Sequence, residues 1–431
     1  MSEVKIPEGY KQTEVGIIPE DWRIATIEDI AIFRNGVAHE KFIDANGKYI
    51  AVNSKFISTE AKVIKRTKVL RNPAYTNEIL MVMSDVPNGR AIAKCFLVPD
   101  DSVYSINQRI CALNITKDNP KYIFYQINRN PYYLAFDDGV KQTNLRRQDV
   151  LDCPLMIPPK QEQNAIATAL SDVNNLIGLL EKLIAKREAI KTGTMQQLLT
   201  GKTRLPEFAT CEDGSPKGFK QTELGWIPED WELTNIRDIS LVPSQNGLFY
   251  EPRRKGSGVP LINVGDMYKS APIDVDQLEL FNATPSEVAV FQVTAGDLLF
   301  TRSSIVPSGI AYCNIFESER DDVVFDSHLI KVRPNRKIIN PRFLYLNCIS
   351  EHARTSLIAE AKSAIMTTID QSAINRCPVL LPSKPEQTAI ATIFSDMDTE
   401  IQALQQRLEK TKDIKQGMMQ QLLTGKVRLA H

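Results

Sequence analysis

The stretch "GYKQTEVGIIPEDW", residues 9–22, occurs again as "GFKQTELGWIPEDW", residues 218–231, with eleven of fourteen positions identical. Further on, residues 163–205 match residues 387–429 at 23 of 43 positions. The two offsets, 209 and 224, differ by 15, so the second copy holds about 15 extra residues between its matching segments. A repeat of this period is far longer than the unit of a solenoid protein, and it predicts a duplicated domain.

The segment that closes each copy has the pattern of a long helix of about 40 residues, or ~60 Å. Gly201 and Gly425 follow as helix-ending glycines. Because the two segments share one heptad register, we expect the helices to pair; the alternative is that each packs on its own domain as an ordinary amphipathic helix. The predicted seam consists of Ile166, Leu170, Val173, Ile177, Leu180 and Ile184, with Ile390, Phe394, Met397, Ile401, Leu404 and Leu408 in the second copy.

Between the matching segments lie two blocks, roughly 35–155 and 244–380, that are mostly unlike each other. Short β-favouring runs broken by turns at "PNG" (87–89) and "PSG" (307–309) precede helical stretches near 120–135 and 341–360. We therefore expect an α+β protein with two mixed domains. The predicted boundaries are a first domain at 1–158, a helix at 159–205, a second domain at 206–381 and a helix at 382–431.

The opening motif has the features of a framework. Trp22 and Trp231 are expected to anchor each domain, and "TIED" (26–29) and "NIRD" (235–238) are expected to cap a helix at the domain entry.

Composition narrows the class of protein. No apolar run approaches the roughly 18 to 20 residues needed to cross a bilayer, and the N-terminus lacks a targeting pattern, so we expect a cytoplasmic protein. The seven cysteines form no C-x-x-C pair and are expected to be free thiols. The 52 basic and 52 acidic side chains cancel, which argues only weakly against a nucleic-acid partner, because one face of a neutral protein can be basic.

No pattern typical of catalysis is present in the sequence. The four histidines, at positions 39, 328, 352 and 431, lack metal-ligand spacing and are expected to be structural or surface residues. The "TGKT" at 200–203 lacks the first glycine of a phosphate-binding loop and follows a helix where such a loop precedes one. The "NPYY" at 130–133 departs from the N-P-P-Y signature of amino-methyltransferases at Tyr132. We therefore predict no catalytic, cofactor or metal site in this chain.

Basic residues cluster in four short runs: "KVIKRTKVLR" (62–71), "KQTNLRRQ" (141–148), "EPRRKGSG" (251–258) and "KVRPNRK" (331–337). Any one run could be a solvated loop. Together they mix cations with Gln, Asn, Ser and Thr, the side chains that touch phosphates and base edges.

The whole chain resembles the DNA-specificity subunit of type I restriction-modification systems. Besides the two opening motifs, the resemblance lies in the strand motifs "EILMVMSDVPNGRAIA" (78–93) and "GDLLFTRSSIVPSGIA" (296–311), and in the helix starts "PPKQEQNAIATALSD" (158–172) and "PSKPEQTAIATIFSD" (382–396). Each helix then ends in "MQQLLTGK". The resemblance implies two target-recognition domains held apart by two long antiparallel conserved helices, coiled-coil-like, with a pseudo-two-fold internal repeat.

The resemblance also implies a function without catalysis. Such a subunit binds double-stranded DNA at a bipartite asymmetric site, with one half read by each recognition domain. It assembles two methyltransferase subunits and two restriction and translocase subunits, which use S-adenosylmethionine, ATP and Mg, while this chain binds no cofactor and no membrane. The alternative from another class is a helical scaffold whose mixed domains bind protein partners.

Thr143–Asn144 lies 224 residues before Thr367–Thr368, so these two loops are expected to be equivalent. The predicted DNA contacts are Arg90, Gln108, Arg109, Lys141, Asn144 and Arg146 in the first domain, and Arg253, Arg254, Arg302, Ser303, Thr367 and Thr368 in the second.

Overall fold

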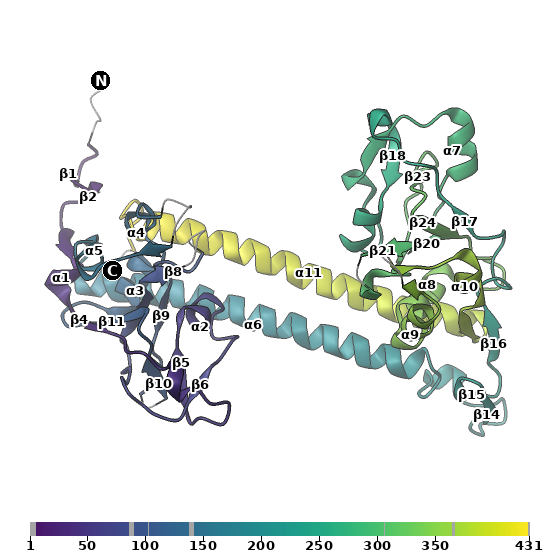
Figure 1. The fold of residues 1–431 in the computed structure, drawn as a ribbon, viewed down its shortest axis with the longest axis horizontal. Helices are drawn as coiled ribbons and strands as arrows, with labels where there is room; N and C mark the ends of the chain where they lie inside the picture. Colours follow the sequence, from purple (N-terminus) through teal and green to yellow (C-terminus); the bar gives the residue numbers. More distant parts are fainter. Residues whose placement is uncertain are drawn as a thin grey trace. The chain divides into compact units, whose positions relative to one another are not determined.

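The structure is a computed structural model that describes residues 6–85, 90–101, 103–137, 142–305, 307–363 and 367–429 (Figure 1). The chain forms two compact units, of which unit 1 comprises residues 1–181 and 406–431 and unit 2 comprises residues 182–405. Two helices of 39 residues each, α6 (Lys160–Leu198) and α11 (Lys384–Leu422), confirm the long helices predicted from the heptad pattern. Each is divided between the two units, so unit 1 is made of two separate segments of the chain, whereas unit 2 is one continuous segment.

Unit 1 is built around a four-stranded antiparallel sheet in the order β4-β11-β7-β9. These strands are Ala31–Asn35, Ile110–Ile115, Ile79–Val82 and Cys95–Leu97. A three-stranded sheet has the order β10-β5-β6, from Tyr104–Ile106, Tyr49–Val52 and Arg66–Thr67. Three strand pairs complete the unit: β1–β2 (Tyr10–Thr13, Gly16–Pro19), β3–β13 (Arg23–Thr26, Pro154–Ile157) and β8–β12 (Ser84–Asp85, Thr143–Asn144).

The short helices of unit 1 begin at sequence signals for helix starts. Asn119 caps α3 by accepting hydrogen bonds from the backbone N–H groups of Lys121 and Tyr122, with Pro120 in the first turn. The short helices of this unit are α1 (Ile27–Ile30), η1 (Glu40–Phe42), α2 (Ser54–Ser58), α3 (Pro120–Ile127), α4 (Pro131–Leu134) and α5 (Arg147–Leu151).

Unit 2 repeats this plan, with a four-stranded sheet in the order β17-β24-β20-β22. These strands are Gln245–Asn246, Leu329–Val332, Leu298–Thr301 and Cys313–Ile315. Sheet β19-β18-β23 is formed by Glu279–Phe281, Lys255–Ile262 and Val324–Phe325, and sheet β21-β26-β25 by Ser303–Ser304, Thr367–Thr368 and Lys362–Ser363. The remaining strand pairs are β14–β15 (Phe219–Thr222, Gly225–Pro228) and β16–β27 (Glu232–Asn235, Pro378–Leu381).

The helices of unit 2 include the predicted stretch at 341–360, which consists of two helices capped by Asn340 and Ser350. The short helices are η2 (Pro206–Phe208), η3 (Pro252–Arg254), η4 (Val264–Tyr268), η5 (Val275–Gln277), α7 (Pro285–Phe291), η6 (Pro307–Gly309), α8 (Pro341–Ile349), α9 (Glu351–Ala359) and α10 (Gln371–Arg376). Among the described residues, no helix is both long and apolar enough to cross a membrane.

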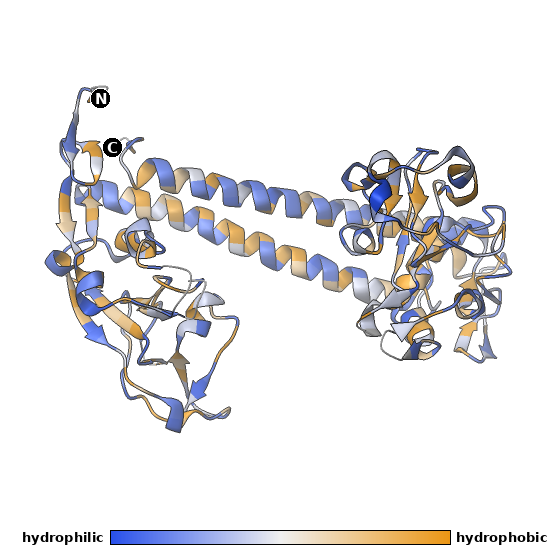
Figure 2. Ribbon diagram, turned by 45° about the horizontal axis from the view of Figure 1, so that its top comes forward, coloured by the Kyte–Doolittle hydropathy of each residue, from blue (hydrophilic) through white to orange (hydrophobic). Residues whose placement is uncertain are grey.

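The core of each unit contains one end of both long helices. In unit 1, Ile166 and Leu170 from the start of α6 share a buried cluster with Leu422 and Leu423 from the end of α11. In unit 2, Ile390 and Phe394 from the start of α11 share a cluster with Leu198 and Leu199 from the end of α6. Figure 2 shows apolar and polar residues alternating along both helices, as an amphipathic pattern requires.

Ion pairs and a hydrogen bond between the two long helices show how they run relative to each other. In unit 2, Arg187 pairs with Glu400 at 2.9 Å and Lys191 pairs with Asp398, so residue numbers rise along α6 as they fall along α11. In unit 1, Lys415 Nζ donates to Asn174 Oδ1 at 2.7 Å. Within each unit the helices therefore run antiparallel, and the twelve predicted seam residues are all buried or half-buried.

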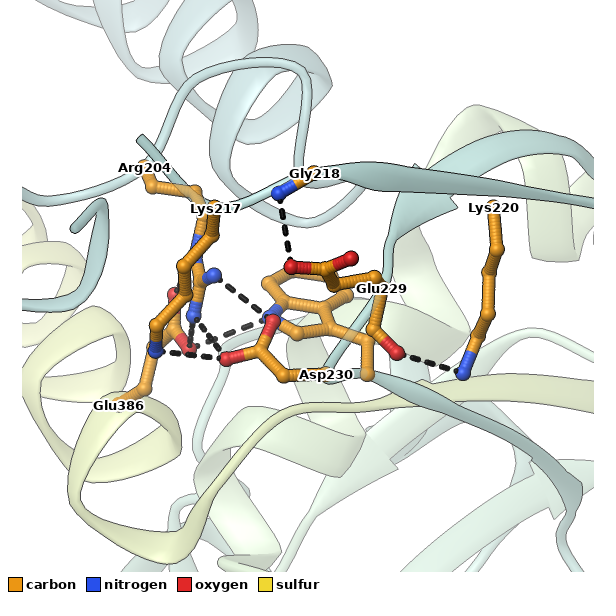
Figure 3. A network of polar contacts seen from close by, with 8 residues as sticks. Arg204, Lys217, Gly218, Lys220, Glu229, Asp230 and Glu386 are labelled. Atoms are coloured by element: carbon orange, nitrogen blue, oxygen red, sulfur yellow. Dashed lines mark hydrogen bonds and ion pairs between the residues drawn. The ribbon is translucent and has the colours of Figure 1, made fainter. Parts of the chain in front are cut away.

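A buried carboxylate ties the opening motif of unit 2 to both long helices (Figure 3). Glu386, in the first turn of α11, is 1% exposed and accepts hydrogen bonds from Trp231 Nε1 at 3.1 Å and from Arg204 Nε at 2.9 Å. Arg204 lies just beyond the end of α6 and also donates to Asp230 at 2.8 Å. We call this group of Trp, Asp, Glu and Arg the anchor network.

Unit 1 contains the same anchor network from the corresponding residues. Glu162, in the first turn of α6, accepts from Trp22 Nε1 at 3.0 Å and from Arg428 Nε at 2.8 Å, and Arg428 also donates to Asp21. These hydrogen bonds raise the pKa of the Arg428 guanidinium. The tryptophans are therefore anchors, as predicted. In each network the arginine comes from one copy of the repeat, and the glutamate and the tryptophan come from the other copy.

Glycine is required where each helix tail crosses the opening motif. Gly201 and Gly425 both have positive φ, +69° and +70°, which disfavours a side chain. A Cβ on Gly201 would lie 2.4 Å from Pro228 Cδ, and one on Gly425 would lie 2.5 Å from Pro19 Cδ. The glycine thus lets the tail pass directly against the "IPEDW" segment.

The two predicted entry caps differ. Thr26 and Asp29 form a capping box at the start of α1, as predicted. Asn235 accepts from the backbone N–H of Asp238 and donates to its carboxylate, but residues 236–239 form a turn rather than a helix. The prediction of a second capped helix was wrong. The backbone N–H of Ile236 donates to the carbonyl of Cys377, so the chain pairs with a distant segment here instead of completing a helical turn.

The arginines of the two anchor networks differ in exposure, which predicts unequal losses of stability on mutation. The Arg204 side chain is 6% exposed and that of Arg428 is 35% exposed. Arg204→Met leaves Glu386 buried without a cation and should lower the free energy of unfolding of unit 2 by about 3–5 kcal/mol, whereas Arg428→Met should cost unit 1 about 1–2 kcal/mol. Native-state hydrogen exchange of each unit measures both values; equal small losses would contradict the assignment.

Buried Lys331 predicts a pH dependence. Its side chain on β24 is 5% exposed, donates to the carbonyl of Gln292 at 2.7 Å, and has its pKa lowered by burial to about 8. Since the unfolded chain binds the proton more tightly, wild-type stability should rise relative to Lys331→Met between about pH 8 and 10.5, by on the order of 2 kcal/mol. Urea titrations of both proteins across this window measure the difference, and a pH-independent difference would refute the shift.

Candidate nucleic-acid interface

In each unit the central strand of the four-stranded sheet continues into a short polar strand. Strands β7 and β20 are wholly buried, and β8 and β21 follow after one residue. Each short strand pairs antiparallel with another two-residue strand, Ser84 opposite Asn144 in unit 1 and Ser303 opposite Thr368 in unit 2. Thr143–Asn144 and Thr367–Thr368 therefore occupy corresponding places, as expected from their spacing.

The strand pair of unit 1 presents a cluster of amides and a hydroxyl. Asn144 is exposed, and its Oδ1 accepts from Ser84 Oγ at 2.7 Å and from Gln142 Nε2 at 3.1 Å. Thr143 is buried and donates to Asp137 at 2.7 Å. Alternate residues thus point outward and inward, and the outward ones are the side chains able to meet base edges.

The turn between β10 and β11 lies beside this cluster. Arg109 is exposed, and its carbonyl accepts from the backbone N–H of Met83, the residue that links β7 to β8. Gln108 is also exposed and donates to Glu40 at 3.2 Å. The turn approaches β4 so closely that a Cβ on Gly36 would lie 1.8 Å from the Asn107 carbonyl oxygen.

The other cations predicted in unit 1 are distributed differently. Arg90 is exposed on a bend after β8, and Lys141 lies outside the described residues. Arg146 is exposed but bonds Asp149 through Nε at 3.2 Å and Nη2 at 3.1 Å. Burial raises the pKa of Asp149, but its hydrogen bonds and ion pair with Arg146 lower the pKa by more than burial raises it. The pKa of Asp149 therefore lies below its usual value.

In unit 2 a pocket gathers the predicted residues of the corresponding strand pair. Arg302, Ser303 and Thr368 line it, while Thr367 is buried. Residues that the sequence did not indicate complete the wall: His328, Glu360, Lys362, Ile369 and Asp370. The cations and hydroxyls of this pocket suit anionic or base-edge acceptors, and Glu360 is engaged by Arg376 at 2.5 Å.

Arg253 and Arg254 lie apart from this pocket's lining, on η3. Arg253 is exposed. Arg254 bonds Glu287 and the carbonyl of Asn282, and its guanidinium lies 4.6 Å from the centre of the Phe281 ring. Both stay predicted contacts, but the guanidinium of Arg254 already has partners within unit 2.

Several residues of these surfaces were missed from the sequence. Ser84 corresponds to the predicted Ser303 within the two quoted strand motifs, so comparing those motifs could have found it. Gln142 sits in the basic run 141–148. His328 was expected to be a structural or surface residue, and only the fold brings it to the pocket. No group of three or more metal-ligating side chains gathers in the part of the chain described.

Comparison with known proteins gives a consistent result. A family model described as "Type I restriction modification DNA specificity domain" matches residues 19–189 and 228–412. A protein of Methanocaldococcus jannaschii, described provisionally as the MjaX type I restriction enzyme specificity subunit, is 25% identical over 445 residues, covering 98% of this chain and 97% of that protein.

Two solved structures share the fold. The crystal structure of a type I restriction-modification S subunit from M. genitalium superposes with a TM-score of 0.58 at 16% identity, covering 97% of this chain and 98% of that one. A chain from a study of complex assembly and conformational transition of a type I R-M system gives 0.52 at 13% identity, covering 95% of this chain and 99% of that one.

Gly36 and Gly247 lie where two stretches of backbone approach closely, which predicts that a side chain at either position destabilises its unit. A Cβ on Gly247 would lie 2.1 Å from the Phe325 carbonyl oxygen, the counterpart of the contact at Gly36. Gly36→Ala and Gly247→Ala should each lower the free energy of unfolding by about 1–3 kcal/mol. Gly178→Ala, within α6 and with no atom near its Cβ, should instead be neutral or stabilising by up to about 1 kcal/mol. Chemical denaturation compares the three, and equal effects would contradict the close approach.

Proposed function

The chain belongs to the family of type I restriction-modification DNA specificity domains, and we propose that each of its units binds one half of a bipartite, asymmetric DNA sequence. The observation that carries this proposal is that one backbone arrangement recurs with different side chains. Ser84 stands opposite Asn144 in unit 1, and Ser303 stands opposite Thr368 in unit 2. Equivalent frames with different donors and acceptors would read different bases, so the DNA site is asymmetric.

The chemistry of each surface fits contact with a duplex. In unit 1 the amides of Asn144 and Gln142 supply a donor and an acceptor apiece, the combination that pairs with an adenine edge. In unit 2 Arg302 supplies a guanidinium that can bond guanine or a phosphate, beside the hydroxyls of Ser303 and Thr368. Phosphate contacts would fix the position of each unit on the DNA, and the outward polar side chains would supply the sequence reading.

The chain itself performs no catalysis under this proposal. It binds no cofactor, and it assembles with two methyltransferase subunits and two restriction and translocase subunits that use S-adenosylmethionine, ATP and Mg. One structural relative comes from a study of complex assembly in a type I R-M system, which supports assembly with partner subunits. The near-neutral charge favours one competitor, a scaffold that binds only proteins.

Selection from a library of random duplexes tests the proposal. The full chain, alone and with its methyltransferase partner, should enrich sequences that contain two constant blocks separated by an unspecified spacer. Binding of the enriched duplex should weaken steeply with salt, because cations that contact phosphates displace counterions. A complex that forms normally but enriches no duplex would favour the protein scaffold.

Single substitutions should then separate the two halves. Asn144→Ala should relax one position in one block, and Thr368→Val should relax one position in the other, each at a cost of about 1–3 kcal/mol in binding. Lys202→Ala, which removes an exposed cation after α6, should leave both blocks unchanged. Repeating the selection with each variant measures this, and a change in both blocks from one substitution would refute separate reading.

A further inference from the structure

The turn that carries Arg109 in unit 1 has a counterpart that carries His328 in unit 2. The carbonyl of Arg109 accepts from the N–H of Met83 at 2.9 Å, and the carbonyl of His328 accepts from the N–H of Arg302 at 2.7 Å. Met83 and Arg302 are themselves equivalent, since each joins the central strand to the short polar strand. Arg109 and His328 thus occupy the same backbone position in the two units.

The start of the turn agrees with this match. Ile110 donates to the carbonyl of Asn107, and Leu329 donates to the carbonyl of Asp326, at 3.0 and 2.9 Å. The next link of the frame also repeats, because Leu145 and Ile369 donate to the carbonyls of Met83 and Arg302 respectively. Three backbone hydrogen bonds per unit therefore define one frame, in which unit 1 has an arginine and unit 2 has a histidine.

One ring nitrogen of His328 is hydrogen-bonded to a carboxylate within unit 2. Nδ1 lies 2.7 Å from Oδ1 of Asp326, whose side chain is buried. Because an ionised carboxylate only accepts, Nδ1 carries a hydrogen in this contact. Nε2 is then an acceptor in the neutral ring and a donor in the protonated ring. The His328 side chain is 56% exposed, so its outer part can meet a ligand.

His328 lines two adjoining pockets. The first contains Arg302, Ser303 and Thr368, the predicted DNA contacts of unit 2. The second contains Ser303 and Ser304 with Tyr268 and Tyr312. The charged or titratable groups facing His328 in its hydrogen bond or across these pockets are Asp326, Arg302, Glu360, Lys362, Asp370, Tyr268 and Tyr312.

The two carboxylates that face the first pocket are already engaged. Glu360 bonds Arg376 at 2.5 Å. Asp370 accepts from the backbone N–H of Ala373 at 2.9 Å and lies 3.7 Å from Lys362 Nζ. The pocket thus offers Arg302 and Lys362 to an incoming anion, and a protonated His328 would add a third cation.

We propose that His328 is a DNA-contacting residue of unit 2, in which protonated Nε2 donates to an acceptor atom of the DNA. This role rests on the proposed function. DNA binding by unit 2 is therefore linked to uptake of one proton, whereas unit 1 has Arg109 at the same position and keeps its charge at all relevant pH values. The acceptor is either a phosphate oxygen or a guanine N7 or O6, which share the same hydrogen-bond chemistry.

Affinity measured against pH tests the linkage. The probe is the duplex that the wild-type chain enriches from a random library, and fluorescence anisotropy gives Kd at about pH 6, 7 and 8 at constant salt. Wild-type affinity should weaken about three- to tenfold from pH 6 to 8, because only the protonated imidazole can donate from Nε2. His328→Gln should remove that dependence, and His328→Arg should bind with pH-independent affinity.

Two further variants control for structural effects. Arg109→Gln should weaken binding by a factor that does not change with pH. Asp326→Asn keeps an acceptor for the ring but removes the carboxylate charge beside it, so it should shift the pH dependence of binding. Hydrogen exchange should show both units of each variant folded.

Repeating the selection with His328→Gln distinguishes the two acceptors. An unchanged motif with weaker binding identifies a phosphate, and relaxation of one position identifies a base. Full retention of the wild-type pH dependence by His328→Gln would overturn the role of His328 and leave the proposed function intact. Failure of the wild-type chain to enrich any duplex would remove the proposed function itself, and this role with it.

Discussion

The buried carboxylate in the first turn of each long helix is the constraint on which the rest of the structure depends. Glu162 and Glu386 are almost fully removed from solvent, and an ionised group in that position needs a cation and further donors nearby. The arginine comes from the tail of the other helix, and the indole N–H comes from the opening motif. All members of the network belong to the repeated segments, so side chains in the divergent blocks can change without disturbing it.

The sequence predicted the elements of this arrangement better than their connections. Heptad spacing located helices that begin at Lys160 and Lys384, because the repeated pattern removes the ambiguity of a single short heptad run. The ion pair between Arg204 and Glu386 was not predicted from the sequence. Glu162 and Glu386 occupy equivalent positions of the repeat, so the sequence pattern alone does not say which of them Arg204 contacts. The length of the helix could have identified the partner. Arg204 and Glu162 lie at opposite ends of one helix, roughly 60 Å long, so these two residues cannot contact each other.

The recognition surfaces were harder to predict for a different physical reason. Strand pairing joins residues such as Ser84 and Asn144, which are 60 apart in the chain, and no local pattern encodes that register. The match between Arg109 and His328 depends on backbone hydrogen bonds, while their side chains have little in common. His328 was expected to be a structural or surface residue, and it is exposed; its place beside the predicted DNA contacts follows only from the fold of this turn.

The path of the chain through the two anchor networks sets an order of assembly during synthesis. Arg204 precedes Glu386 by 182 residues, so unit 2 has its arginine available as soon as its acid emerges from the ribosome. Glu162 instead precedes Arg428 by 266 residues, and unit 1 cannot neutralise its buried acid until that arginine has been made. A nascent chain therefore carries an incomplete first unit throughout the synthesis of the second, although the two are built from the same parts.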